Sequence, residues 1–267
     1  MKAARLEDLP ASEDLADFGD QRVPRGEKAS LVRALFNGVA PHYDLMNDLM
    51  SAGIHRQWKA ALVDALNPAP PLNLVDVAGG TGDITFRIWD RMARRFDAKA
   101  MAACRLIVCD PSDGMLGVGR DRALDRGLPV AAVRFIGGMA EALPLPDTSQ
   151  DAYTISFGLR NVTDMDAGLA EARRVLRWGG RFLCLEFGGP VAPALAAAYA
   201  LYSDHVIPRL GGMVAGQEDS YRYLVESIRR FPDRAEVVAR MERAGLARVH
   251  ARPLLGGIAT LYSAWRI

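Results

Sequence analysis

The sequence predicts an α/β fold built on a parallel, doubly wound sheet. Short apolar runs alternate with segments of helical periodicity along most of the chain, a spacing typical of such sheets. A glycine-rich turn joins the first of these runs to a helix, and two further strands follow the last helix. Within 267 residues this pattern predicts one large domain with additions at both ends.

The expected elements follow in order along the chain. Residues 1–28 are polar and carry several acidic side chains, so we expect a loose arm there. Residues 29–267 are expected to form a single domain that opens with a cap of two or three helices over 29–67. Apolar runs predict strands at 72–77, 105–110, 131–136, 150–156 and 181–187. Helical spacing predicts helices at 82–94, 112–126 and 164–177.

The C-terminal third departs from this alternation. Trp178-Gly179-Gly180 is typical of a helix C-terminus that reverses the chain into the next strand. Residues 189–231 follow as a largely apolar insertion, which we expect on the substrate side of the domain. A helix over 233–244 then precedes strands near 247–253 and 257–267. We expect these two strands to close the sheet as an antiparallel hairpin.

A nucleotide-binding turn follows the first expected strand. Its candidate cofactor residues are Asp76, Gly79, Gly80, Thr81 and Gly82. Glycines let the backbone turn tightly against a ligand, and the next helix offers free N–H groups. Thr85 replaces the third glycine of a dinucleotide fingerprint, and Asp83 puts an anion where a pyrophosphate would bind. The turn therefore favours S-adenosylmethionine over a nicotinamide dinucleotide, and a turn without a ligand is the alternative.

A second carboxylate is expected at the same edge of the sheet. Asp110 ends the run 105–110, and an aspartate there can accept hydrogen bonds from both ribose hydroxyls. It lies further from the turn than the typical ~20 residues, and the alanine-rich segment 97–104 accounts for the extra length. A helix cap or a loop contact with solvent is the alternative for an isolated strand-end aspartate.

Composition excludes several classes of protein. A formal net charge of +1 gives no electrostatic case for nucleic acid. The three cysteines form no C-x-x-C pair, which indicates reduced thiols in a cytoplasmic protein. The acidic N-terminal segment fits neither a secretory signal nor a transit peptide, and no apolar run reaches the ~18 residues of a membrane span. Cysteine, histidine and carboxylate spacings predict no metal site.

Three strings beyond the glycine-rich turn make a family resemblance specific. They are Tyr43-Asp44-Leu45-Met46-Asn47-Asp48 within 39–59, Phe157-Gly158-Leu159-Arg160-Asn161-Val162 within 154–164, and Asp219-Ser220-Tyr221-Arg222-Tyr223 within 219–228. From about residue 33 to residue 267 the chain resembles the UbiE/Coq5-type C-methyltransferases of ubiquinone and menaquinone biosynthesis. The resemblance implies a class I, Rossmann-like methyltransferase fold that uses S-adenosylmethionine. It also implies methylation of a ring carbon of a 2-methoxy-6-polyprenyl-1,4-benzoquinol, a demethylmenaquinol, or both.

The resemblance further implies roles for residues outside the turn. Met139 and Ala140 match the string that contacts the adenine, although many family members carry an asparagine where Met139 stands. Ser156 matches another cofactor position, and Tyr43 the aromatic ring that closes over the cofactor's methionine, with core packing as the alternative. The candidate substrate residues are His55, Tyr221 and Tyr223.

Arg160 and Asn161 are the candidate catalytic residues, together with Asp110. Both follow the strand 150–156 at its carboxyl end, where ligands bind in such sheets. A guanidinium can stabilise phenolate character in the acceptor, and Asn161 would orient the ring hydroxyls. The alternative for Arg160 is an ion pair with Asp164 or a helix-end contact. The proton acceptor stays open between an Asp110–Arg160–water relay and His55, whose alternative is a surface or capping role.

The apolar insertion predicts where the acceptor's tail binds. Apolar surface at this density must be buried or must meet lipid. Because the resemblance implies a polyprenyl quinol as substrate, we expect its tail to bind here and the protein to contact the inner face of a membrane peripherally. Packing on the core, a homodimer interface or a quinone-biosynthesis complex are the alternatives for the same segment. Two rival functions remain open. One is methylation of another small apolar acceptor, and the other is a non-catalytic scaffold.

Overall fold

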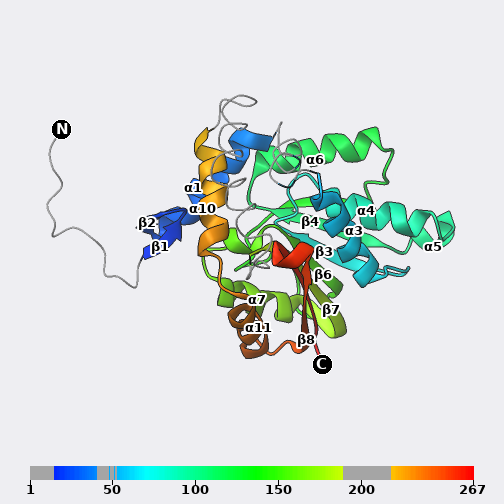
Figure 1. Ribbon diagram of the computed structural model, residues 1–267. Helices are drawn as coiled ribbons and strands as arrows, with labels where there is room; N and C mark the ends of the chain where they lie inside the picture. Colours follow the sequence, from blue (N-terminus) through cyan, green and yellow to red (C-terminus); the bar gives the residue numbers. More distant parts are fainter. Residues whose placement is uncertain (1–14, 41–47, 49–50, 52, 189–217) are drawn as a thin grey trace, which may run out of the picture.

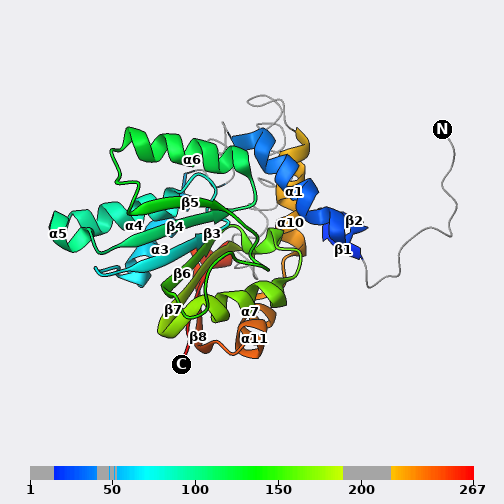
Figure 2. The same cartoon turned by 180° about the vertical axis from the view of Figure 1, so that it is seen from behind.

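Helices flank a seven-stranded sheet in the computed structural model, seen from opposite sides in Figure 1 and Figure 2. The structure describes residues 15–40, 48, 51, 53–188 and 218–267, without the side chains of 218–221. Tyr43, the first fourteen residues of the expected arm and most of the apolar insertion therefore lie outside the described residues.

The sheet has the strand order β5-β4-β3-β6-β7-β9-β8. In chain order, the strands are β3 (Asn73–Val77), β4 (Arg105–Asp110), β5 (Val133–Gly137), β6 (Gln150–Ser156), β7 (Leu176–Phe187), β8 (Ala247–Leu254) and β9 (Ala259–Trp265). Neighbours among the first five strands pair in parallel, whereas β9 is antiparallel to both β7 and β8. The predicted doubly wound sheet and its closing hairpin are confirmed. The strand order reverses direction at β3, where such sheets bind ligands.

The helices predicted at 82–94, 112–126, 164–177 and 233–244 are present, with ends that differ by one or two residues. The predicted helical cap begins at residue 25 rather than 29, and the helices at 98–101 and 218–230 were not predicted. The described helices are α1 (Arg25–Val39), α3 (His55–Leu66), α4 (Asp83–Ala93), α5 (Ala98–Met101), α6 (Asp113–Asp125), α7 (Met165–Val175), α10 (Glu218–Arg230) and α11 (Arg234–Arg243), with the 3-10 turns η4 (Leu159–Asn161) and η6 (Leu255–Gly257). Side-chain caps fix where several of them begin. Ser112 accepts a hydrogen bond from the N–H of Met115, and Asp164 one from Ala167.

The core lies on both faces of the sheet because successive strand residues point in opposite directions. Leu74 belongs to the cluster that contains Leu62 of α3 and Ile88 of α4. Its neighbour Val75 belongs to the opposite cluster, which contains Leu169 of α7 and Met241 of α11. Each such side chain contributes roughly 1.5–3 kcal/mol when it is fully buried. The two clusters hold the strand ends, and hence the candidate site, in a fixed arrangement.

The prediction of a loose arm up to residue 28 is wrong for its second half. Residues 15–24 form the hairpin β1 (Leu15–Phe18) and β2 (Gln21–Pro24), and α1 begins directly after it. The partners of the hairpin come from α10, at the other end of the chain. Glu226 accepts a hydrogen bond from the N–H of Asp20, and Arg230 pairs with Asp17 and Asp20. Among the described residues of the expected arm, Asp17 and Asp20 are thus engaged by a distant helix.

The prediction that the glycine pair at 179–180 ends a helix is wrong. The helix α7 ends at Val175, and β7 begins at once with Leu176. Gly179 has a φ of 76° and donates to the carbonyl of Arg266, whose N–H donates back to Gly180. The Arg266 guanidinium donates to the carbonyls of Arg173, Arg174 and Leu176. These bonds satisfy the helix end, so the glycines instead form a bulge within β7.

Candidate active site

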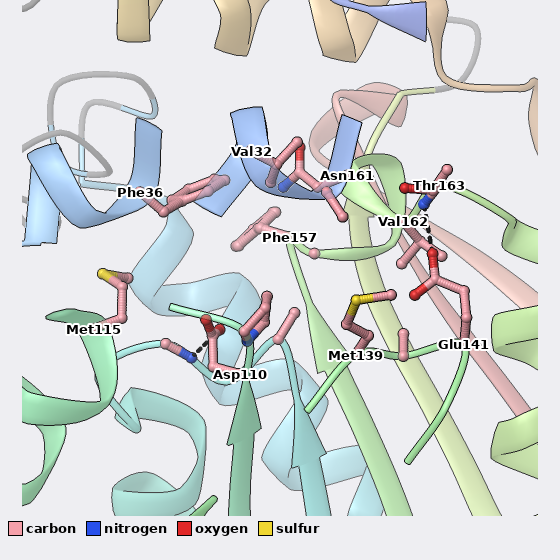
Figure 3. A pocket seen from close by; sticks show the side chains of 16 residues that line it. Val32, Phe36, Asp110, Met115, Met139, Glu141, Phe157, Asn161, Val162 and Thr163 are labelled. Carbon is pink, nitrogen blue, oxygen red and sulfur yellow. Dashed lines mark hydrogen bonds between the residues drawn. The ribbon is translucent and has the colours of Figure 1, made fainter. Parts of the chain in front are cut away.

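A largely apolar cavity lies at the carboxyl ends of β3, β4 and β6, and we call it the central cavity (Figure 3). Asp110 lies at its floor, and Val32 and Phe36 of α1 lie across it. The complete lining is Ala29, Val32, Phe36, Ala78, Gly80, Asp110, Pro111, Met115, Met139, Ala140, Glu141, Phe157, Gly158, Asn161, Val162 and Thr163. Five residues predicted for the site thus come together here, namely Gly80, Asp110, Met139, Ala140 and Asn161.

The glycine-rich turn forms part of this floor. A Cβ on Gly79 would lie 2.8 Å from the carbonyl oxygen of Asp76 and 2.8 Å from Val108 Cγ1, so only glycine fits between the two strands. Gly80 and Gly82 have φ values of 54° and 82°, in the left-handed region that favours glycine. Of the turn's glycines and threonine, Gly80 alone lines the cavity. The others shape the turn that presents it.

Asp110 ends β4 with its carboxylate in the central cavity. Its Oδ2 accepts a hydrogen bond of 2.9 Å from the N–H of Gly80, and its Oδ1 accepts one of 2.9 Å from Ser112. Burial raises the pKa of Asp110 to about 6, against the effect of these two backbone hydrogen bonds. Each oxygen keeps acceptor capacity on the side of the cavity. The carboxylate is therefore fixed in position and is charged at neutral pH.

Asp76 and Ser156, also predicted as cofactor residues, do not line the central cavity. Asp76 is fully buried and accepts hydrogen bonds from the hydroxyls of Thr154 at 2.8 Å and Thr85 at 3.1 Å. Burial raises the pKa of Asp76 to about 6. These contacts give Asp76 a structural role beneath the turn, which ties β3 to β6 and α4. The Ser156 hydroxyl is buried without a hydrogen-bond partner among the described residues.

The loop after β5 forms the side wall opposite α6. Met139 and Ala140 line the cavity there, as predicted from the resemblance, and Met139 is the more exposed of the two. The next residue, Glu141, accepts hydrogen bonds from the N–H groups of Thr163 at 2.7 Å and Asp164 at 3.2 Å. Glu141 therefore joins this loop to the segment after η4, and both walls of the cavity are held together.

Arg160 and Asn161 lie side by side in η4 but point in different directions. Arg160 donates to Glu186 at 2.6 Å and to the carbonyl of Phe157 at 2.6 Å, and the ion pair is almost completely buried. The predicted alternative partner Asp164 pairs with Arg25 instead. Asn161 lines the central cavity, and its Oδ1 accepts a hydrogen bond of 3.1 Å from the hydroxyl of Tyr223. The catalytic roles of Arg160 and Asn161 stay predictions.

His55 does not line the central cavity. Its Nδ1 lies 2.8 Å from the hydroxyl of Ser51, at the start of α3. Burial, together with the Lys59 ammonium, lowers the pKa of His55 to about 4. The ring is buried rather than a surface residue. Tyr43 and the side chain of Tyr221 lie outside the described residues, so their predicted roles stay predictions.

A second, polar cavity adjoins the first, and we call it the polar cavity. It lies among the hairpin β1–β2, α1, η4, α7 and α10, and Arg160 and Tyr223 both line it. Val162 and Thr163 line both cavities, so η4 and the residues after it form a shared wall. Burial raises the pKa of Tyr223 to about 12, so its hydroxyl stays protonated at neutral pH.

Sequence reasoning missed the contribution of α1 and the partner of Arg160. The apolar spacing identified Phe36 as part of a helix, but did not indicate that it faces the central cavity. Asn37 Oδ1 accepts hydrogen bonds from the Ser112 hydroxyl at 2.6 Å and the N–H of Gly114 at 3.1 Å, which hold α1 against α6. Glu186 was missed because only the parallel pairing of β6 and β7 brings it to Arg160.

Comparison with known proteins gives matches over nearly the whole chain. A sequence model of the ubiE/COQ5 methyltransferase family matches residues 23–266. A protein of Methylobacterium nodulans named ubiquinone/menaquinone biosynthesis C-methyltransferase UbiE is 51% identical over 261 residues, 97% of this chain and 100% of that protein. One of the same name from Rhodopseudomonas palustris is 50% identical, over 94% of this chain and 96% of that protein.

Among solved structures, a S-adenosylmethionine-dependent methyltransferase from Aquifex aeolicus matches with a TM-score of 0.55 and 14% identity, over 78% of this chain and 89% of that one. At this identity the likeness shows the fold alone. Within the described part of the chain, no helix is long and apolar enough to cross a membrane. The same residues contain no group of three or more His, Cys, Asp or Glu side chains that could hold a metal ion.

Proposed function

Because the chain belongs to the ubiE/COQ5 methyltransferase family, we propose that it methylates a ring carbon of a polyprenylated quinol. The acceptor is a 2-methoxy-6-polyprenyl-1,4-benzoquinol, a demethylmenaquinol, or both, and the methyl donor is S-adenosylmethionine. The observation that carries the proposal is the near-complete match to relatives that bear this activity in their names, about half of whose residues are identical. Those names cover both the ubiquinone and the menaquinone route.

The central cavity suits the methyl donor. The Asp110 carboxylate can accept hydrogen bonds from the two ribose hydroxyls, and Gly80 leaves room beside it because a Cβ there would lie 2.8 Å from the Met115 side chain. Met139 and Ala140 offer an apolar wall for the adenine. When bound, S-adenosylmethionine supplies an electrophilic methyl group on a positively charged sulfur.

The wall between the two cavities suits the acceptor ring. Asn161 and Tyr223, joined by their hydrogen bond, provide polar groups that orient ring hydroxyls. Arg160 lines the polar cavity on the same wall, and its guanidinium stabilises negative charge that develops on the ring oxygen. Fixing the acceptor carbon in line with the donor contributes much of the rate in such reactions.

The acceptor's tail accounts for the predicted partners. A polyprenyl quinol is held in a bilayer, so we propose that the protein collects it at the inner face of a membrane. The apolar segment predicted to receive the tail falls mostly within residues 189–217, outside the described residues. A homodimer and a complex with other enzymes of quinone biosynthesis stay predictions for the same reason.

Calorimetric titration and a methylation assay test the proposal together. We expect micromolar binding of S-adenosylmethionine and no binding of NADH. We also expect mass spectrometry to detect transfer of one methyl group to chemically reduced short-tail quinols of either type. Donor binding with methylation of other small apolar molecules only would replace the proposed acceptor. Binding without any turnover on acceptors presented in vesicles would favour the scaffold.

A matched pair of variants makes the test specific to the site. Asp110→Ala should abolish measurable donor binding, whereas Asp113→Ala should leave it unchanged, because Asp113 is exposed and does not line the central cavity. Equal donor affinity in the two variants would remove Asp110 from the donor site.

A further inference from the structure

Lys28 of α1 is a buried ammonium group that no step described so far uses. Its side chain is 6% exposed and lines the polar cavity, together with Arg160 and Tyr223. Its Nζ donates a hydrogen bond of 3.1 Å to the carbonyl oxygen of Val162. An ammonium can donate three hydrogen bonds, and this is the one the described residues accept from it. Two donor positions therefore remain for a group inside the cavity.

The carboxylates nearest Lys28 are engaged elsewhere. Asp17 of β1 pairs with Arg230, and Glu141 accepts from two backbone N–H groups. Within the described residues, neither they nor any other carboxylate forms an ion pair with Lys28. A buried ammonium without a counter-ion costs more free energy than a buried neutral amine that keeps its hydrogen bond. The surroundings therefore favour a lysine that gives up its proton more readily than usual.

The charged groups around Lys28 act in both directions, and burial outweighs them. Burial lowers the pKa of Lys28 most, and the Arg25 guanidinium on the same helix adds to the effect. Asp17 and Glu141 oppose it by raising the pKa. On the remaining walls of the polar cavity, Arg160 forms a buried ion pair with Glu186. The further charged residues that line this cavity are Arg22, Asp164, Asp166, Arg230 and Arg240.

The position of Lys28 matters as much as its charge. Val162, to which it is bonded, lines both the polar and the central cavity. The amine therefore lies at the wall where the methyl donor and the acceptor ring have to meet. The other candidate bases are less suited. His55 lies outside both cavities, Asp110 is held by Gly80 and Ser112, and an arginine cannot be deprotonated in a protein.

We propose that Lys28 is the base that takes the proton from the acceptor's ring hydroxyl. This inference rests on the proposed function. The hydroxyl proton moves to Lys28 in its deprotonated form, and the electron pair left on oxygen enriches the ring carbon. That carbon forms a bond to the methyl carbon, and the methyl–sulfur bond breaks with its electron pair kept by sulfur. The ring carbon then releases its own proton to water, and Lys28 returns its proton to the ring oxygen.

Two substitutions distinguish a catalytic base at position 28 from a residue that only holds η4 in place. Lys28→Arg keeps a positive donor for the Val162 carbonyl but cannot accept a proton, and Lys28→Gln keeps a neutral donor. We expect both to retain the affinity for S-adenosylmethionine within about threefold. We expect both to lose about 100-fold or more in kcat, the usual contribution of a general base. The exposed Lys99 of α5 provides the control Lys99→Arg, which should match the wild type in both measurements.

Chemical rescue gives a readout that a structural role would not move. In Lys28→Ala, added primary amines of small size should restore turnover, more so for the more basic amines. Turnover of Lys28→Arg within a few-fold of the wild type would overturn the proposal. Loss of donor affinity in every Lys28 variant would also overturn it, because Lys28 would then support η4. The proposed function has its own control, since wild-type turnover is measured in the same assay. Absence of that turnover would overturn both.

Discussion

Replacing Glu186 by glutamine tests directly whether the buried ion pair between Glu186 and Arg160 holds the candidate site together. Glu186 is completely buried and accepts hydrogen bonds from the Arg160 guanidinium, the Arg160 N–H and the N–H of Phe187. A glutamine of the same shape keeps one oxygen acceptor, but it presents an amide donor to a second N–H. It also leaves the Arg160 guanidinium, 3% exposed, without a counter-ion.

The expected cost follows from this burial. Breaking a buried ion pair by removing one partner typically destabilises a protein by about 3–5 kcal/mol. For a domain of this size that corresponds to a fall in melting temperature on the order of 10 °C. Chemical denaturation followed by circular dichroism would give the free energy of unfolding directly. Because Glu186 fixes η4, we also expect a lower kcat at saturating donor.

A matched control uses the same substitution at an exposed pair. Glu236 pairs with Arg240 and Arg243 on the surface of α11, and its side chain is 41% exposed. Glu236→Gln should cost at most about 1 kcal/mol, as exposed ion pairs do. If Glu186→Gln cost no more than this control, the buried pair would not hold the site together, and the reasoning above would be wrong.

Three further predictions address the donor, the acceptor and the packing between them. Donor affinity should be constant well above pH 6 and fall as the pH drops through it, because protonation removes the Asp110 carboxylate, whose pKa is about 6. Asp110→Asn should bind weakly with no such pH dependence, and an unchanged titration profile would contradict the ribose role. Arg160→Lys keeps the charge but loses the planar fork, so kcat should fall at least about tenfold with donor affinity intact, and a normal kcat would make Arg160 purely structural. Gly158→Ala should destabilise the protein by about 1–3 kcal/mol, because the added Cβ would lie 2.5 Å from the Cβ of Ala78. The second substitution Ala78→Gly should restore the stability of this variant in thermal melts. If it did not, the strain would lie elsewhere.

Local patterns were sufficient to predict the sheet and part of the candidate site. Gly80 and Asp110 could be placed together from the sequence, because parallel strands bring their carboxyl ends to one edge. The apolar wall at Met139 and Ala140 followed from the family resemblance, which applies to a continuous string. Each of these residues owes its place to neighbours along the chain or to the common direction of the strands.

Residues that depend on distant partners could not be placed in this way. The hairpin β1–β2 is held by Arg230 of α10, and Arg160 is held by Glu186 of β7. Asp76 lies in the expected turn, but it faces Thr85 and Thr154 rather than the cavity. Whether a polar side chain serves a ligand or the protein itself depends on tertiary packing, which spacing along the sequence does not contain.

A single helix, α1, contributes side chains to the walls of both cavities. One turn of α1 places Ala29 and Val32 over the central cavity, while Lys28 beside them reaches the carbonyl of Val162 on the wall shared with the polar cavity. Because these contacts come from one helix, an occupant that holds α1 against the central cavity should also hold Lys28 at the polar cavity. Donor and acceptor should then bind with positive cooperativity, and by linkage each should tighten the other by the same factor.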